Sequence, residues 1–152
     1  RAADKAVAAY GLREALALLG EAAEICGRLG EPATATLMAV HRKRTDLFFG
    51  VGEFTRSRAE AETLLALARR ARDDAAVAGA LVQAASAEHG AENFPRALAQ
   101  AREAIEIAER VPSPAALAGG LYVRGYVEAV SGQLGAAESD LESSLAIGAR
   151  RG

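Results

Sequence analysis

The chain has 152 residues, and its 18 Lys and Arg against 20 Asp and Glu give a formal net charge of −2. This balance provides no overall basic field for nucleic acid or for an anionic membrane surface. Hydrophobic residues make up 51% of the chain but aromatic residues only 5%, and this alanine- and leucine-rich composition predicts an all-α fold.

Apolar residues recur at helical spacing along the whole chain. Pro32, Pro95 and Pro114 stand where a first helical turn would begin, and Ser113 is a candidate N-cap. Glycines at positions 30, 50, 52, 90 and 132 fall where helices would end. We therefore predict helices over residues 2–9, 12–28, 33–49, 55–71, 75–89, 95–110, 115–131 and 135–149.

The sequence also matches itself at an offset of 40 residues, which sets Phe54, Phe94 and Leu134 in register. Apolar or small residues follow each anchor at steps of 3, 7, 11 and 14. The same frame placed on Leu12 gives an earlier copy, 42 residues upstream of Phe54. A fixed period between about 20 and 50 residues is typical of stacked-repeat proteins. The repeats cover approximately residues 1–29, 33–71, 75–110 and 115–149, in a single domain.

The last copy, from Leu121 to Ala137, resembles a tetratricopeptide repeat. Two small residues, one on each helix, mark the close crossing of a helical hairpin in that family. The matching positions here are Thr45 with Ser57, Ala85 with Ala97, and Gly125 with Ala137. The resemblance implies an α-solenoid of about four antiparallel hairpins with a right-handed superhelix. The repeat period here is 40 residues, against 34 in the family. The distance from Gly125 to Ala137 is the family's spacing within one hairpin, so the six additional residues of each repeat lie between one hairpin and the next.

The alanine- and arginine-rich style also resembles the C-terminal helical arms of large bacterial signalling ATPases, including those linked to nucleotide cyclases or to transcription regulators. The first residue is Arg1 rather than methionine, so we expect a fragment of a longer bacterial protein. The single cysteine, Cys26, cannot form an internal disulfide, which favours a cytoplasmic location. Its place on the apolar stripe of its helix predicts a buried, unreactive thiol.

No catalytic, cofactor-binding or metal-binding pattern is found, and we expect a protein that is not an enzyme and needs no cofactor. His41 and His89 lack metal-ligand spacing, and the pair Asp73-Asp74 is typical of a solvated turn. The basic cluster at residues 41–44 is too small for nucleic acid and is splayed by the turn of a helix. The longest uncharged apolar stretch, residues 115–123, is too short to span a membrane.

The resemblance implies a concave groove that binds a peptide or protein segment, which could be another domain of the same parent protein. In each repeat, the groove positions lie three residues before, one residue after and four residues after the small crossing residue of the first helix. They are Arg42, Asp46 and Phe49; Val82, Ser86 and His89; and Tyr122, Tyr126 and Ala129. Arg42 would supply a charge-assisted contact, and the tyrosines would be amphipathic anchors. The alternative is that both tyrosines pack between neighbouring helices.

A second functional class, self-association, also fits the sequence. We expect the first repeat to start in the middle of a hairpin, because only about eight residues precede Tyr10-Gly11. An end with an uncovered apolar face would dock on the rest of the parent protein or on a second copy, as a homodimer.

Overall fold

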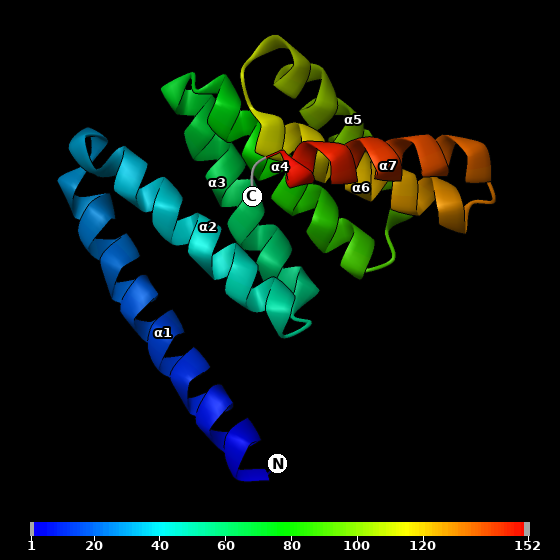
Figure 1. Ribbon diagram of the computed structural model, residues 1–152. Helices are drawn as coiled ribbons and strands as arrows, with labels where there is room; N and C mark the ends of the chain where they lie inside the picture. Colours follow the sequence, from blue (N-terminus) through cyan, green and yellow to red (C-terminus); the bar gives the residue numbers. More distant parts are fainter. Residues whose placement is uncertain (1, 151–152) are drawn as a thin grey trace.

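The computed structural model describes the backbone of residues 2–150 and the side chains of residues 11–150. Seven α-helices follow one another within this range, and each packs against the next (Figure 1). They are α1 (Ala2–Leu29), α2 (Thr34–Gly50), α3 (Phe54–Ala71), α4 (Asp74–Gly90), α5 (Phe94–Arg110), α6 (Pro114–Val130) and α7 (Leu134–Ala149). A short 3-10 turn, Glu31–Ala33, joins α1 to α2. The all-α prediction is confirmed, and the predicted bounds of α2 to α7 agree within one residue.

The prediction of two helices before residue 29 is wrong. Residues Ala2–Leu29 form one continuous helix of 28 residues, and Tyr10-Gly11 does not interrupt it. A glycine inside a helix costs only about 1 kcal/mol relative to alanine, and alanine-rich neighbours readily continue the helix. A separate segment of eight residues would also be too short to hold a helix on its own. The described chain therefore has three hairpins, α2–α3, α4–α5 and α6–α7, preceded by a single long helix, instead of four hairpins.

Each hairpin crosses closely at the two small residues that the sequence indicates. Thr45, Ser57, Ala85, Ala97, Gly125 and Ala137 are all buried. The Ser57 hydroxyl donates a hydrogen bond to the carbonyl oxygen of Thr45 over 3.0 Å, across the first crossing. A Cβ atom added to Gly125 would stand 3.1 Å from the carbonyl oxygen of Ala137, so the third crossing has no room for a side chain.

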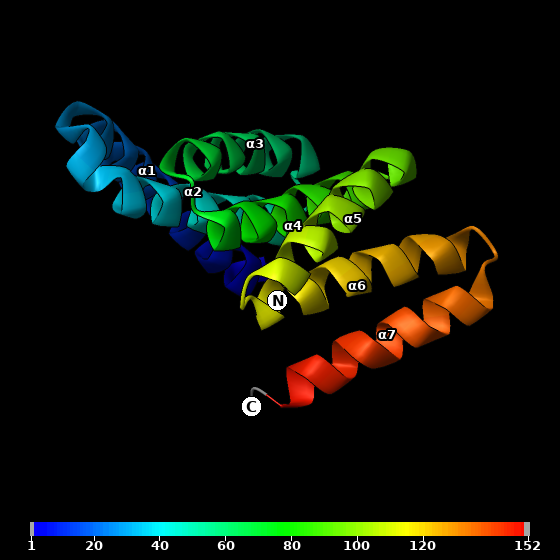
Figure 2. The same ribbon diagram turned by 90° about the horizontal axis from the view of Figure 1, so that it is seen from above.

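The first helices of the hairpins touch one another in chain order, α2 with α4 and α4 with α6. Among the described helices, α3, α5 and α7 make no such contacts with each other and pack only on the first helices beside them. Figure 2 shows the resulting progression of hairpins across the molecule. The apolar core lies between hairpins, where Leu81 and Val77 of α4 pack with Ala68 of α3, and with Ile107 and Ala116 from the helices that follow.

The additional length of the repeat is helical. The links between hairpins are short, residues 72–73 and 111–113, so the six residues lengthen the helices on either side of them. Asp73 caps α4 by accepting a hydrogen bond from the amide of Ala76 over 2.9 Å, which assigns this residue to a turn, as expected. Ser113 occupies the N-cap position of α6, but its side chain makes no capping hydrogen bond.

The turns inside the three hairpins share one backbone conformation. Residues 52, 92 and 132 all have left-handed φ angles, of 79°, 59° and 81°. Each donates its N–H to the carbonyl oxygen three residues earlier, over 3.0, 3.0 and 3.1 Å. Two of these residues are glycines, for which the conformation has no steric cost, and the third is Glu92.

Replacing Glu92 with glycine should therefore stabilise the fold. A left-handed conformation costs a residue with a side chain roughly 1–2 kcal/mol, so we expect Glu92→Gly to raise the free energy of unfolding by about 1 kcal/mol. Urea denaturation measures the change. The reverse substitution at the matched turn, Gly132→Ala, should lower the stability by a similar amount, and a Glu92→Gly chain that is less stable than the natural one would contradict the argument.

Candidate interaction surface

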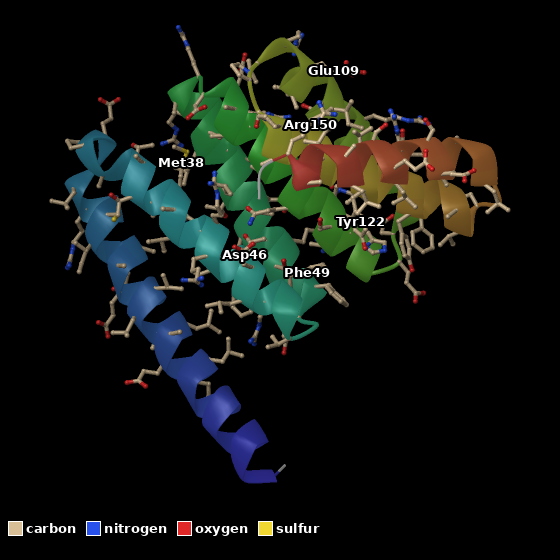
Figure 3. The ribbon with its side chains drawn as sticks, in the orientation of Figure 1. Met38, Asp46, Phe49, Glu109, Tyr122 and Arg150 are labelled. Atoms are coloured by element: carbon tan, nitrogen blue, oxygen red, sulfur yellow. The ribbon has the colours of Figure 1, made fainter. Side chains whose placement is uncertain are left out.

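The predicted groove positions lie on the first helices of the three hairpins. One set is on α2, one on α4 and one on α6, and spacings of three and four residues hold each set on one helix face. We call these eight residues the first-helix row: Arg42, Asp46, Phe49, Val82, Ser86, His89, Tyr122 and Tyr126. Because α2, α4 and α6 touch in order, the row is continuous from one hairpin to the next. Figure 3 labels Asp46, Phe49 and Tyr122, which lie along these helices.

Both tyrosines of the row are accessible. Tyr122 is 51% exposed and Tyr126 is 40% exposed, and Phe49 at the other end of the row is also exposed. Val82, Ser86 and His89 on the middle helix are partly buried. The alternative in which both tyrosine rings are buried between neighbouring helices therefore does not describe this structure.

One end of the row is an aromatic cluster without charge. The rings of His89 and Tyr126 meet almost edge-on, with centroids 4.2 Å apart, and the Phe94 ring lies 6.5 Å from the His89 ring. Burial lowers the pKa of His89 below its usual value of 6.5. The imidazole is therefore neutral at physiological pH, and this end of the row presents aromatic edges and two phenolic hydroxyl groups.

The other end of the row is polar and includes a residue that the sequence analysis missed. Gln83 of α4 donates a hydrogen bond from Nε2 to Oδ1 of Asp46 on α2, over 2.7 Å. This bond fixes the orientation of the amide, and the Oε1 atom of Gln83 is buried without a hydrogen-bond partner among the described residues. A small hollow of about 120 Å³ lies beside it, lined by Thr45, Asp46, Phe49, Ser57, Gln83 and Ser86.

The basic cluster at residues 41–44 divides between two faces of α2, as its helical spacing predicts. His41 and Arg44 each lie 2.7 Å from the carboxylate of Glu60 on α3. Burial alone would raise the pKa of Glu60, but the hydrogen bond from His41 and the charge of Arg44 lower it below its usual value. These contacts fasten α2 to α3. Arg42 is exposed on the row and forms no ion pair with a described residue.

A larger cavity, of about 630 Å³, lies away from the row, where the α5–α6 link meets the end of α7. Its wall includes Glu109 and Arg150, which Figure 3 labels in the upper part of the view, above Asp46 and Phe49. Between α3 and α5, Arg69 and Glu103 form an ion pair at 2.8 Å and line a smaller hollow of about 340 Å³. Forty residues later these positions are Glu109 and Ser143, which cannot form that pair.

The described part of the chain has no cluster of three His, Cys, Asp or Glu side chains arranged as metal ligands. None of its helices has the length and apolar character needed to cross a bilayer. The chain matches no protein-family model and no curated protein sequence.

The neutral state of His89 predicts a stability that depends on pH. As the pH falls, the unfolded chain, with a histidine pKa of about 6.5, takes up a proton before the folded chain does. The contribution of neutral His89 to the free energy of unfolding is therefore complete above the unfolded pKa and decreases as the pH falls through it. We expect the free energy of unfolding to decrease between about pH 7.5 and pH 5.5, where carboxyl groups hardly titrate.

The substitution His89→Gln isolates this effect. Urea denaturation at both pH values should show a smaller loss of stability in the variant than in the natural chain. An equal loss in both would show that His89 does not change its protonation on unfolding.

Proposed function

We propose that this chain is a non-enzymatic interaction module of the tetratricopeptide-repeat type. In this proposal the hairpins wind as a right-handed solenoid, and the first-helix row lines its concave side. The close crossings at small residues and the consecutive contacts of α2, α4 and α6 support this arrangement. The ligand is a peptide or an extended segment of another protein.

The observation that carries the proposal is the combination of exposed aromatic rings with a buried, unpartnered acceptor on one continuous surface. Buried polar atoms without a partner are rare in folded proteins, and each one calls for an explanation. A backbone N–H of a bound segment would satisfy the Oε1 atom of Gln83 at the hollow between α2 and α4. The exposed Tyr122 and Tyr126 provide the type of aromatic area that is enriched at interfaces.

The charges of the row favour one feature in the ligand. Asp46 already accepts a hydrogen bond from Gln83, whereas the guanidinium of Arg42 has no carboxylate partner among the described residues. A carboxylate in the ligand would pair with Arg42 in a charge-assisted hydrogen bond. We therefore expect the preferred segments to combine an acidic residue with apolar side chains that pack on Phe49 and on the tyrosine rings.

Selection from a random peptide library, with the whole chain as bait, tests the proposal. Selected peptides should bind at least about 30-fold more weakly to the double variant Tyr122→Ala/Tyr126→Ala, because truncating two interface anchors costs 2 kcal/mol or more. Isothermal titration calorimetry measures the affinities, and circular dichroism confirms that the variant is folded.

The matched control is Leu145→Ala on α7, which removes a side chain that is 73% exposed and lies outside the row. This change should leave the affinity as it is. Peptides that bind equally well to the tyrosine variant and to the natural chain would contradict the assignment of the row as the binding surface.

A further inference from the structure

The long helix α1 carries an apolar stripe whose large side chains the described structure leaves exposed. Within the described chain, α1 contacts only α2 and the 3-10 turn before it, and its first half extends beyond the end of α2 (Figure 1). Leu12, Leu19 and Cys26 face α2 and are partly or fully buried. Leu18 and Ile25, on the neighbouring face, are 60% and 49% exposed, and Leu29 on the same face is also exposed.

This stripe has the spacing of a coiled-coil seam. Residues 11, 15, 18, 22, 25 and 29 follow one another at steps of 4, 3, 4, 3 and 4, which is a heptad pattern. The residues of the seam are Gly11, Ala15, Leu18, Ala22, Ile25 and Leu29. Small residues alternate with large ones over most of its length. A second helix could therefore approach closely and place its large side chains over the small ones.

In the internal register α1 corresponds to α3, α5 and α7, the second helices of the hairpins, but its exposed face differs from theirs. Leu18 corresponds, through the internal register, to Glu60 of α3, Gln100 of α5 and Asp140 of α7. Glu60 and Asp140 form ion pairs with the first helix of their own hairpins, to Arg44 and Arg124. The leucine of α1 cannot form such a contact. The face of α1 is therefore apolar at the position where α3 and α7 carry a paired carboxylate.

We propose that this seam binds α1 of a second copy of the chain, in antiparallel orientation about a two-fold axis. Glu14, Glu21 and Arg28 flank the seam at steps of seven residues. In an antiparallel pair, equivalent flanks face each other. Glu14 then meets Arg28 of the second copy at both ends of the contact, and in the same register Leu18 lies over Ala22, and Ile25 over Ala15, of the second copy.

In a parallel pair, Glu14, Glu21 and Arg28 would face the other flank of the second copy. That flank is made by Leu12, Leu19 and Cys26 and already packs on α2. The charge pattern therefore favours the antiparallel arrangement. In that arrangement Glu21 stands near the axis, close to Glu21 of the second copy, which makes the pairing weaker than the seam alone would give. The first-helix row lies on α2, α4 and α6 and the seam on α1, so the two surfaces share no residue.

Sedimentation equilibrium of the whole chain tests the dimer. The contact involves one helix from each copy and is smaller than a standard stable interface. We therefore expect a reversible dimer with a dissociation constant in the micromolar range. The double variant Leu18→Glu/Ile25→Glu should be monomeric with an unchanged circular dichroism spectrum, because both side chains are exposed in the monomer. The control Leu145→Glu, on the exposed face of α7, should dimerise like the natural chain.

Charge substitutions test the orientation. Glu14→Arg and Arg28→Glu should each weaken the dimer at least about 10-fold, since each sets two like charges against each other at both ends of the seam. An equimolar mixture of the two variants, or the double variant Glu14→Arg/Arg28→Glu, should restore association. Glu21→Gln should strengthen it by removing the repulsion at the axis.

A natural chain that is monomeric at every concentration would overturn the proposal and leave the stripe to a helix from another protein. A dimer that is unaffected by the Leu18 and Ile25 substitutions would also overturn it. If the exchanged charges do not restore association, the antiparallel geometry is wrong.

Discussion

The close crossing of two helices at a pair of small residues sets the position of every hairpin in this protein. At each crossing the backbones approach so closely that the side chains are reduced to hydroxyl, methyl or hydrogen, as in Thr45 with Ser57 and Gly125 with Ala137. This approach fixes the angle between the two helices of the hairpin. It also determines which face of the first helix remains available to the next hairpin and to a ligand.

Buried charge then fastens the hairpins to one another. Glu88 of α4 is fully buried, and its carboxylate lies 3.0 Å from Nε of Arg96 on α5 and 3.7 Å from a guanidinium nitrogen of Arg58 on α3. The side chain of Asn93 donates a further hydrogen bond to it, over 2.9 Å. One carboxylate thus joins three consecutive helices. Such a group disfavours alternative packings, because they would leave its charge buried and unpaired.

The helices from α2 onward could be predicted from the sequence because each is bounded by proline, glycine or a capping residue, and because the 40-residue register repeats the pattern. The same signals mislead at α1, because Gly11 resembles a helix end in the sequence but is an ordinary helical residue among alanines. The first-helix row was also predictable, since fixed offsets from a crossing residue define one helix face.

Gln83 was not predictable in this way, since its role depends on the distance between two helices that are far apart in the sequence. The seam of α1 depends on a difference between repeats rather than on their similarity. It becomes visible only when the polar residues of α3, α5 and α7 are compared with those of α1, where Leu18 stands in place of Glu60.

The most direct test of the close crossing is whether Gly125→Ala raises or lowers the free energy of unfolding. In a helix interior, Gly→Ala normally raises the free energy of unfolding by up to about 1 kcal/mol. At Gly125 the added methyl group would meet the carbonyl oxygen of Ala137 and the side chain of Leu141 at 3.0–3.1 Å, and crowding of this kind costs about 1–3 kcal/mol. The structure therefore predicts a net decrease of about 1 kcal/mol for Gly125→Ala. The control Gly27→Ala, where no atom lies within 4 Å of the added Cβ, should give an increase. If both substitutions stabilise the chain equally, the close crossing does not determine this fold.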